Sequence, residues 1–324
     1  MSGGIDNGMT TVTLRVHRFT PRQERERDRA RGGSPFAKKS SPFGGGAARR
    51  RPRGKQWVQE YTLPASPQDT VLDCLLAIKR GVDPTLAFRY SCGHGMCGSD
   101  AVAINGTPTL LCTATVKDWA RRPGAAATAD DEGFRRTGDA AEAGSPAPEA
   151  EGPEPDGAQD AVGADGSLGV IELSALPGFP VQRDLIADID PMLDQIRKLK
   201  PYLQADGVLA TTAEGKVDVF EYLQRPEQLA RYEMLSNCIA CGVCEGSCPV
   251  FAGGDAFIGP AALITASRFI NDSRDTATEA RLDAIDTADG IAACQSVRAC
   301  SRECPRGIDV GEEIWQLIAQ VKER

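Results

Sequence analysis

The sequence predicts an α+β protein whose first part is built mainly of strands and whose second part is built of helices. Residues 10–19 alternate between apolar and polar side chains, which is the period of a half-buried strand. From residue 189 onward, apolar residues recur at the spacing of an amphipathic helix. Two cysteine-rich runs, 238–249 and 294–305, fall within this helical part, which is therefore expected to carry a site as well as a core.

The composition is that of a soluble globular protein, with 324 residues of which 41% are hydrophobic and 25% charged. No stretch of 18 apolar residues occurs, so no membrane-spanning helix is expected, and the first residues lack the features of a secretory signal. Ten of the eleven cysteines lie in metal-cluster spacings, which favours a reducing cytoplasm over disulfides. The eleventh, Cys74, lies among leucines and is expected to be buried.

The net charge of −8 is unevenly distributed. Residues 20–56 contain twelve basic and three acidic residues, whereas residues 123–167 contain two basic and eleven acidic residues. Both segments have too few apolar residues to fold alone, so they are predicted to be insertions of low complexity. The basic segment has few interleaved aromatic residues, and no nucleic-acid partner is expected.

The individual elements follow from periodicity and from turn and capping residues. Strands are expected at 10–19, 57–63, 101–104, 107–112 and 169–173. Helices are expected at 71–81, 189–199, 226–236, 259–270, 275–286 and 309–322. Asp69 and Thr70 can cap the first helix, and the Asn105-Gly106 pair predicts a tight turn between two strands. The first two strands are expected to pair antiparallel across the basic segment.

The first candidate site is a cysteine motif just before the third predicted strand. Plant-type [2Fe–2S] ferredoxins use the spacing C-x4-C-x2-C with a distant fourth cysteine. Cys92, Cys97 and Cys112 fit three of these positions, and Asp100 stands where the remaining cysteine belongs. A carboxylate can ligate iron, so the four residues are predicted to hold a [2Fe–2S] cluster. The alternative is that Asp100 only donates or accepts hydrogen bonds near a cluster that is ligated differently.

The second candidate site begins with the run 238–249, whose spacing C-x2-C-x2-C-x3-C-P is that of bacterial ferredoxins. In two-cluster ferredoxins the fourth cysteine of such a run ligates the other cluster. The second run, 294–305, matches this pattern except that Val297 occupies the position of the second cysteine.

Exchanging the last cysteine of each run gives two ligand sets. The set predicted for [4Fe–4S] is Cys238, Cys241, Cys244 and Cys304. The set predicted for [3Fe–4S] is Cys248, Cys294 and Cys300, because valine cannot coordinate iron. A structural zinc site is the alternative, since C-x2-C pairs also bind zinc.

With these motifs placed, the sequence resembles the iron–sulfur subunit of the succinate dehydrogenase/fumarate reductase (complex II) family. Beyond the cysteine runs, the resemblance is carried by Phe88-Arg89-Tyr90-Ser91-Cys92, Cys97-Gly98-Ser99-Asp100, Leu176-Pro177-Gly178-Phe179-Pro180-Val181-Gln182-Arg183-Asp184, Phe257-Ile258-Gly259-Pro260-Ala261 and Arg268-Phe269-Ile270-Asn271-Asp272-Ser273-Arg274-Asp275. It implies a β-grasp [2Fe–2S] ferredoxin domain at 1–186, which contains both insertions. It also implies an α-helical ferredoxin domain at 187–324, with [4Fe–4S] and [3Fe–4S] clusters.

The resemblance implies an electron-transfer subunit of an oxidoreductase that acts on CH–CH donors. Electrons would pass between FAD in a partner flavoprotein and a quinone at membrane-anchor subunits, through the three clusters in turn. FAD, quinone and an optional haem would belong to the partners, and no catalytic residue is expected in this chain. The subunit is expected at the cytoplasmic face of the cell membrane, held there by the anchor.

Two departures from the family pattern bear on the quinone. Ubiquinone-reducing members commonly have a tryptophan shortly after the first Cys-Pro and a histidine after the first cysteine of the second run. Here those places are occupied by 249–254 and by Gln295. Menaquinone is therefore favoured, and a fumarate reductase is the first alternative. The residues expected near the quinone and the [3Fe–4S] cluster are Pro249, Val250, Phe251, Gln295 and Val297.

A second alternative is the iron–sulfur subunit of a heterodisulfide- or thiol-linked reductase. That class would carry two complete [4Fe–4S] clusters and would need a cysteine at position 297, where this chain has valine.

Overall fold

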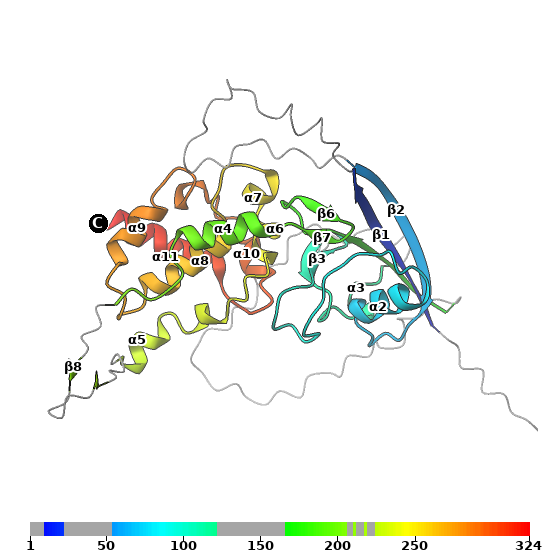
Figure 1. Ribbon diagram of the computed structural model, residues 1–324, viewed down its shortest axis with the longest axis horizontal. Helices are drawn as coiled ribbons and strands as arrows, with labels where there is room; N and C mark the ends of the chain where they lie inside the picture. Colours follow the sequence, from blue (N-terminus) through cyan, green and yellow to red (C-terminus); the bar gives the residue numbers. More distant parts are fainter. Residues whose placement is uncertain (1–9, 23–53, 122–165, 206–209, 212–216, 219–223) are drawn as a thin grey trace, which may run out of the picture.

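The computed structural model describes residues 10–22, 54–121, 166–205, 210–211, 217–218 and 224–324. Most of the basic segment and nearly all of the acidic segment lie outside these ranges, so their predicted character stays a prediction. Figure 1 shows the large sheet at one end of the molecule, with α2 and α3 beside it, and the other labelled helices toward the opposite end, in agreement with the α+β class.

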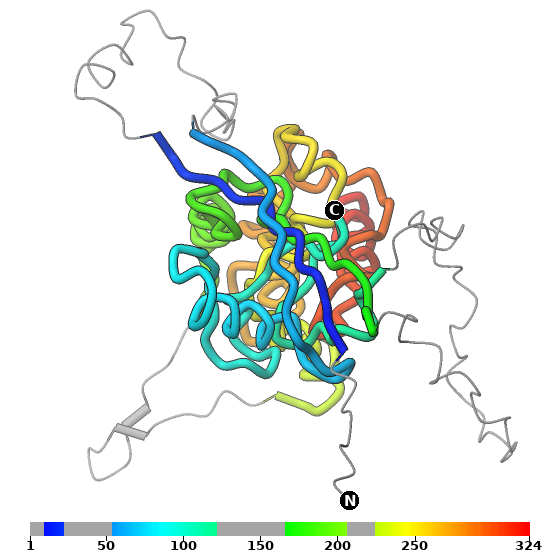
Figure 2. Tube along the Cα trace, turned by 90° about the vertical axis from the view of Figure 1, so that its right-hand side faces the viewer, coloured from blue at the N-terminus to red at the C-terminus, as the bar shows by residue number. Residues whose placement is uncertain are grey.

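A five-stranded sheet forms the strand-rich part, in the order β2-β1-β5-β3-β4. β2 pairs antiparallel with β1 along its whole length, as predicted, and β5 lies parallel to β1 on the other side. The long β1–β2 pair is seen as two neighbouring blue tubes in Figure 2. The strands are β1 (Thr11–Pro21), β2 (Gly54–Pro64), β3 (Ala101–Ile104), β4 (Thr107–Leu110) and β5 (Ser167–Ser174).

The sheet buries the apolar face that the alternation of β1 predicts. Val12, Leu14 and Val16 are fully buried in the cluster to which helix α2 (Val71–Gly81) contributes. Of the two predicted caps, Thr70 is the one that caps α2: its hydroxyl accepts from the N–H of Asp73, whose carboxylate accepts from the N–H of Thr70. The predicted burial of Cys74 on this helix is confirmed, with 2% of its surface exposed.

A buried carboxylate joins the sheet to the segment that leads into the first cysteine motif. Asp184 accepts hydrogen bonds from the N–H of Phe19 on β1 at 3.0 Å and from that of Ala87 at 2.9 Å. It also pairs with the buried guanidinium of Arg18 at 2.9 Å. Breaking a buried ion pair of this kind commonly costs about 3–5 kcal/mol. Asp184 therefore holds the segment at Ala87, which leads into the first cysteine motif, against strand β1.

The rest of the described chain is mainly helical, with two short two-stranded elements apart from the sheet. The helices are α3 (Val116–Trp119), α4 (Asp190–Lys198), α5 (Pro226–Ala230), α6 (Val243–Ser247), α7 (Pro249–Gly253), α8 (Pro260–Ile270), α9 (Thr278–Ile285), α10 (Ala299–Arg302) and α11 (Val310–Lys322), with 3-10 turns η1 (Met234–Asn237) and η2 (Ile291–Ala293). Short strands are β6 (Val181–Arg183), β7 (Ile186–Ala187), β8 (Ala210–Thr211) and β9 (Val217–Asp218), paired as β6–β7 and β8–β9.

Two predicted helices differ from the structure. The helix expected at 226–236 is divided into α5 and η1, because the buried Tyr232 holds the turn between them. Its hydroxyl donates to Gln224 Oε1 at 2.7 Å and accepts from Arg274 at 2.8 Å. The helix expected to begin at 275 begins instead at Thr278, since Asp275 pairs with the buried Arg281 at 2.9 Å.

Buried apolar side chains form two clusters, one under the sheet and one among the helices. The two clusters do not divide at residue 186, the predicted boundary between the domains. Leu176 and Phe179, which precede it, pack in the helical cluster, and Val243, which follows it, packs in the sheet cluster. None of the helices in the described ranges has the length and apolar character needed to cross a bilayer.

Candidate metal-cluster sites

The loop that begins at Cys92 directs backbone N–H groups at sulfur atoms. The N–H of Gly95 donates to Cys112 Sγ at 3.2 Å, and that of Met96 donates to Cys92 Sγ at 3.4 Å. Hydrogen bonds from the backbone of His94, from Cys97 and from the backbone of Met96 lower the pKa of Cys92 to about 7. Such donors stabilise negative charge on sulfur, whether on a thiolate or on a metal-bound ligand.

Asp100 lies beside these sulfur atoms with 3% of its surface exposed. Its Oδ2 accepts from the N–H of Cys112 at 2.7 Å, whereas its Oδ1 has no hydrogen-bond partner among the described residues. Burial, together with the neighbouring Asp100, raises the pKa of Cys112 to about 12. A buried oxygen without a partner is costly, and an iron ion would satisfy it. One oxygen thus forms the hydrogen bond of the alternative interpretation while the other is free to ligate.

The two cysteine-rich runs surround two separate hollows of about 370 Å³ each. The cysteines that line the first are Cys238, Cys241, Cys244 and Cys304. Those that line the second are Cys248, Cys294 and Cys300. Each hollow therefore collects the cysteines that exchanging the last member of each run puts together. In the described part of the chain, no three His, Cys, Asp or Glu side chains form a group that could hold a single metal ion.

The two runs repeat the same backbone course. The third residue of each, Ala240 and Ser296, has a φ of 49° and 57°. The fifth residue of each, Gly242 and Arg298, has a φ of 81° and 61°. A 3-10 turn precedes each run, and a short helix, α6 in the first and α10 in the second, lies within it. Val297, which is 50% exposed, therefore occupies the place that a cysteine has in the first run.

Two short helices serve both hollows. α6 contains Cys244 of the first hollow and is followed by Cys248 of the second. α10 contains Cys300 of the second hollow, and Cys304 of the first follows shortly after its end. Burial raises the pKa of Cys300 to about 12, as it does for Cys241. Thiols in such surroundings ionise only when a positive charge such as bound iron compensates them.

Glu245 is a site residue that the sequence pattern did not single out. It is fully buried, with Oε2 3.0 Å from Cys244 Sγ and Oε1 accepting from the N–H of Ala261 at 2.8 Å. Burial raises the pKa of this carboxyl. A charged residue between Cys244 and Cys248, which line different hollows, was the available signal.

Four of the five residues expected near a quinone line the second hollow, and the fifth does not. Pro249, Val250, Gln295 and Val297 line the second hollow. Phe251 is not among its lining residues; it is buried in the helical core, with its ring centroid 5.2 Å from that of Phe179.

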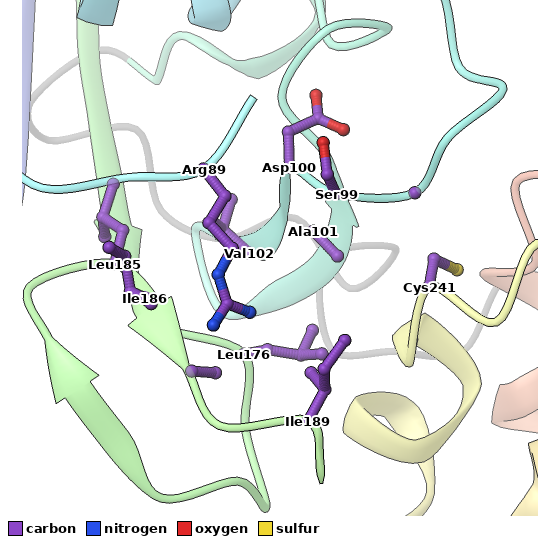
Figure 3. A pocket seen from close by; sticks show the side chains of 12 residues that line it. Arg89, Ser99, Asp100, Ala101, Val102, Leu176, Leu185, Ile186, Ile189 and Cys241 are labelled. Atoms are coloured by element: carbon purple, nitrogen blue, oxygen red, sulfur yellow. The ribbon is translucent and has the colours of Figure 1, made fainter. Parts of the chain in front are cut away.

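A cavity of about 350 Å³ marks the junction between the first motif and the first cysteine-rich run. Figure 3 shows Ser99 and Asp100 on one side of it and Cys241 on the other, with Arg89 projecting between them and Ile189. The first motif and the first hollow are thus neighbours in the fold although more than a hundred residues separate them in the sequence.

Comparison with known families matches both cysteine-rich parts of the chain. Residues 13–194 match the family model of a 2Fe-2S iron-sulfur cluster binding domain, and residues 234–308 match that of a 4Fe-4S dicluster domain.

Similar curated proteins extend over most of the chain. The fumarate reductase iron-sulfur subunit of Mycobacterium tuberculosis is 32% identical over 251 residues, which cover 78% of this chain and 80% of that protein. The succinate dehydrogenase iron-sulfur subunit of Coxiella burnetii is 31% identical over 269 residues, covering 82% and 91%. The Escherichia coli fumarate reductase iron-sulfur subunit is 28% identical over 273 residues, covering 82% and 89%.

Among solved structures, a chain of the Mycobacterium smegmatis Sdh1 complex in the apo form superposes with a TM-score of 0.62. The match covers 98% of this chain and 97% of that one at 19% identity, which supports the same fold.

Proposed function

Because this chain belongs to the iron–sulfur subunits of the succinate dehydrogenase and fumarate reductase family, and so to an oxidoreductase, we propose that it carries electrons between a flavoprotein and a membrane quinone. The observation that carries this proposal is the connected arrangement of three cysteine groups. The first motif contacts the first hollow, and two short helices serve both hollows.

The proposed ligand sets follow these groups. Cys92, Cys97, Asp100 and Cys112 would hold [2Fe–2S], in which the unpartnered Oδ1 of Asp100 supplies the fourth bond. The first hollow would hold [4Fe–4S] on its four cysteines, and the second would hold [3Fe–4S] on three, with Val297 at the missing corner. These clusters supply one-electron chemistry when bound.

The protein's own contribution is to hold and insulate the ligands. Cys112 and Cys300 are buried among apolar side chains, and the other cysteines of the two hollows are partly buried against the same clusters, which lowers the local dielectric constant. Backbone N–H groups directed at Cys92 and Cys112 stabilise negative charge there. No acid–base step on a substrate is assigned to this chain.

The partners are proposed from the family. FAD would lie in a flavoprotein subunit, and a quinone with an optional haem in anchor subunits, at the cytoplasmic face of the membrane. Gln295 and the residues after Pro249 favour menaquinone over ubiquinone. We treat 1–186 and 187–324 as two domains whose cores interlock. Relatives named for either reaction match at similar identity, so a physiological fumarate reductase is the alternative direction.

The test is EPR spectroscopy on the assembled enzyme as isolated in air, after succinate and after dithionite. We expect a [3Fe–4S] signal in the oxidised sample that disappears with succinate. A second [4Fe–4S] cluster, or clusters that succinate leaves oxidised, would instead favour a thiol-linked reductase. Zinc without iron in the purified protein would contradict any redox role.

A further inference from the structure

We propose that the contact between Gly98 and Cys241 is the point at which an electron passes between the first and second centres. This inference rests on the proposed function and adds to it the residues at the crossing. Gly98 lies between Cys97 and Asp100, two proposed ligands of the first cluster, and Cys241 is a proposed ligand of the second.

The two segments lie too close together to leave room for a side chain at position 98. A methyl group on Gly98 would lie 2.7 Å from Cys241 Cβ, 3.1 Å from Cys241 Cα and 3.3 Å from Ile239 Cδ1. Gly98 also has a φ of 66°, in the left-handed region. Two independent reasons therefore require glycine at position 98: its left-handed backbone conformation and the lack of space for a side chain.

Arg306 links the two segments beside this contact. Its Nη1 lies 3.1 Å from Met96 Sδ in the first motif, and its Nε donates to the carbonyl of Asn237, next to Cys238, at 3.4 Å. Arg306 also lines the first hollow. One side chain thus joins the loop of the first centre to the run that holds the second.

The crossing is a one-electron step without bond making or breaking. The first centre is oxidised by one electron as the second is reduced by one, and no proton moves. Electron transfer between metal centres slows steeply as the gap between them widens. Gly98 directly follows the proposed ligand Cys97, and Cys241 is itself a proposed ligand. Any change that separates Gly98 from Cys241 therefore widens the gap between the two centres.

The experiment compares Gly98→Ala with Gly93→Ala in the assembled enzyme. Gly93 belongs to the same loop and has a φ of 73°, but a methyl group there would meet nothing within 4 Å. Both variants carry the strain of an alanine in the left-handed region, and only Gly98→Ala forces the two segments apart.

The readouts are iron content, the [2Fe–2S] EPR signal and freeze-quench EPR after mixing with succinate. In Gly98→Ala we expect [2Fe–2S] to be reduced first and to stay reduced, while the oxidised [3Fe–4S] signal, which an electron from [2Fe–2S] reaches only past this contact, is lost several-fold more slowly. In Gly93→Ala the order and rate should match the wild type. An unchanged rate in a fully loaded Gly98→Ala enzyme, or equal slowing in both variants, would overturn the proposal.

If Gly98→Ala does not load its clusters, Arg306→Gln decides. It removes the charged bridge without touching a ligand, so we expect the same delay, smaller in size, and an unchanged rate would contradict the proposal. Failure of the proposed function is distinguishable, because succinate would then reduce no cluster even in the wild type.

Discussion

The two cysteine-rich runs share a backbone but differ in what they can bind. Ala240 and Ser296, and likewise Gly242 and Arg298, take left-handed φ values at the same places. The second run keeps this course although Val297 replaces a cysteine, so the loop does not depend on a fourth ligand for its shape. The identity of one side chain, and not the fold, is expected to set the number of iron atoms.

The largest effect is expected from Val297→Cys. The backbone already places this residue where the first run has Cys241, so a thiolate there would complete a four-ligand set. We expect the [3Fe–4S] signal of the oxidised enzyme to be lost and the iron content to rise by about one atom per chain. Val297→Ala should leave both unchanged. A persistent [3Fe–4S] signal in Val297→Cys would contradict the equivalence of the two runs.

The second-largest effect is expected at Gly242, the fifth residue of the first run. Gly242→Ala places a methyl group 3.1 Å from Leu176 Cδ2 and 3.3 Å from Phe179 Cζ at a φ of 81°. Strain and overpacking together should destabilise the protein by about 2–4 kcal/mol. The measurement is the temperature at which the visible cluster absorbance is lost. Gly253→Ala is the control, since a methyl group there would meet nothing within 4 Å and the residue has no left-handed φ.

The sequence predicted those features that depend on local pattern. The alternation in β1, the cap at Thr70 and the grouping of cysteines by hollow all follow from residue type and spacing. The features it missed depend on contacts between distant segments. The hydrogen bonds that join Tyr232 to Gln224 and Arg274 divide a helix that local propensity favours, and the approach of Gly98 to Cys241 has no signal in either segment alone.

An ion pair that belongs to the second run gives a pH-dependent test. Burial alone would raise the pKa of Asp309, but hydrogen bonds from Ser301 at 2.7 Å and from Arg298 hold it below its usual 3.8. A carboxyl whose pKa is lower in the folded than in the unfolded protein stabilises the fold at pH values above the unfolded pKa. This stabilisation is lost as the pH falls below 3.8 toward the folded-state pKa.

Asp309→Asn should therefore be less stable than the wild type at neutral pH by about 0.5–1 kcal/mol, because asparagine can still cap α11 but loses the charge that pairs with Arg298. The difference should shrink as the pH falls below 3.8. Denaturant unfolding at a series of pH values measures it, with Asp194→Asn, on an exposed pair, as the control. A difference that is constant with pH would show that the charge of Asp309 is not involved.

The smallest effect is expected from Arg298→Gly, which gives the second run the residue of the first. The change relieves a left-handed conformation that costs about 1–2 kcal/mol. It also removes the ion pair with Asp309 and the contact with the Trp315 ring, 4.6 Å from the guanidinium, which together contribute a similar amount. Stability should thus change by less than about 1 kcal/mol. Arg298→Ala keeps the strain and loses the contacts, so it should be the less stable of the two; the reverse order would mean that backbone strain at this position is negligible.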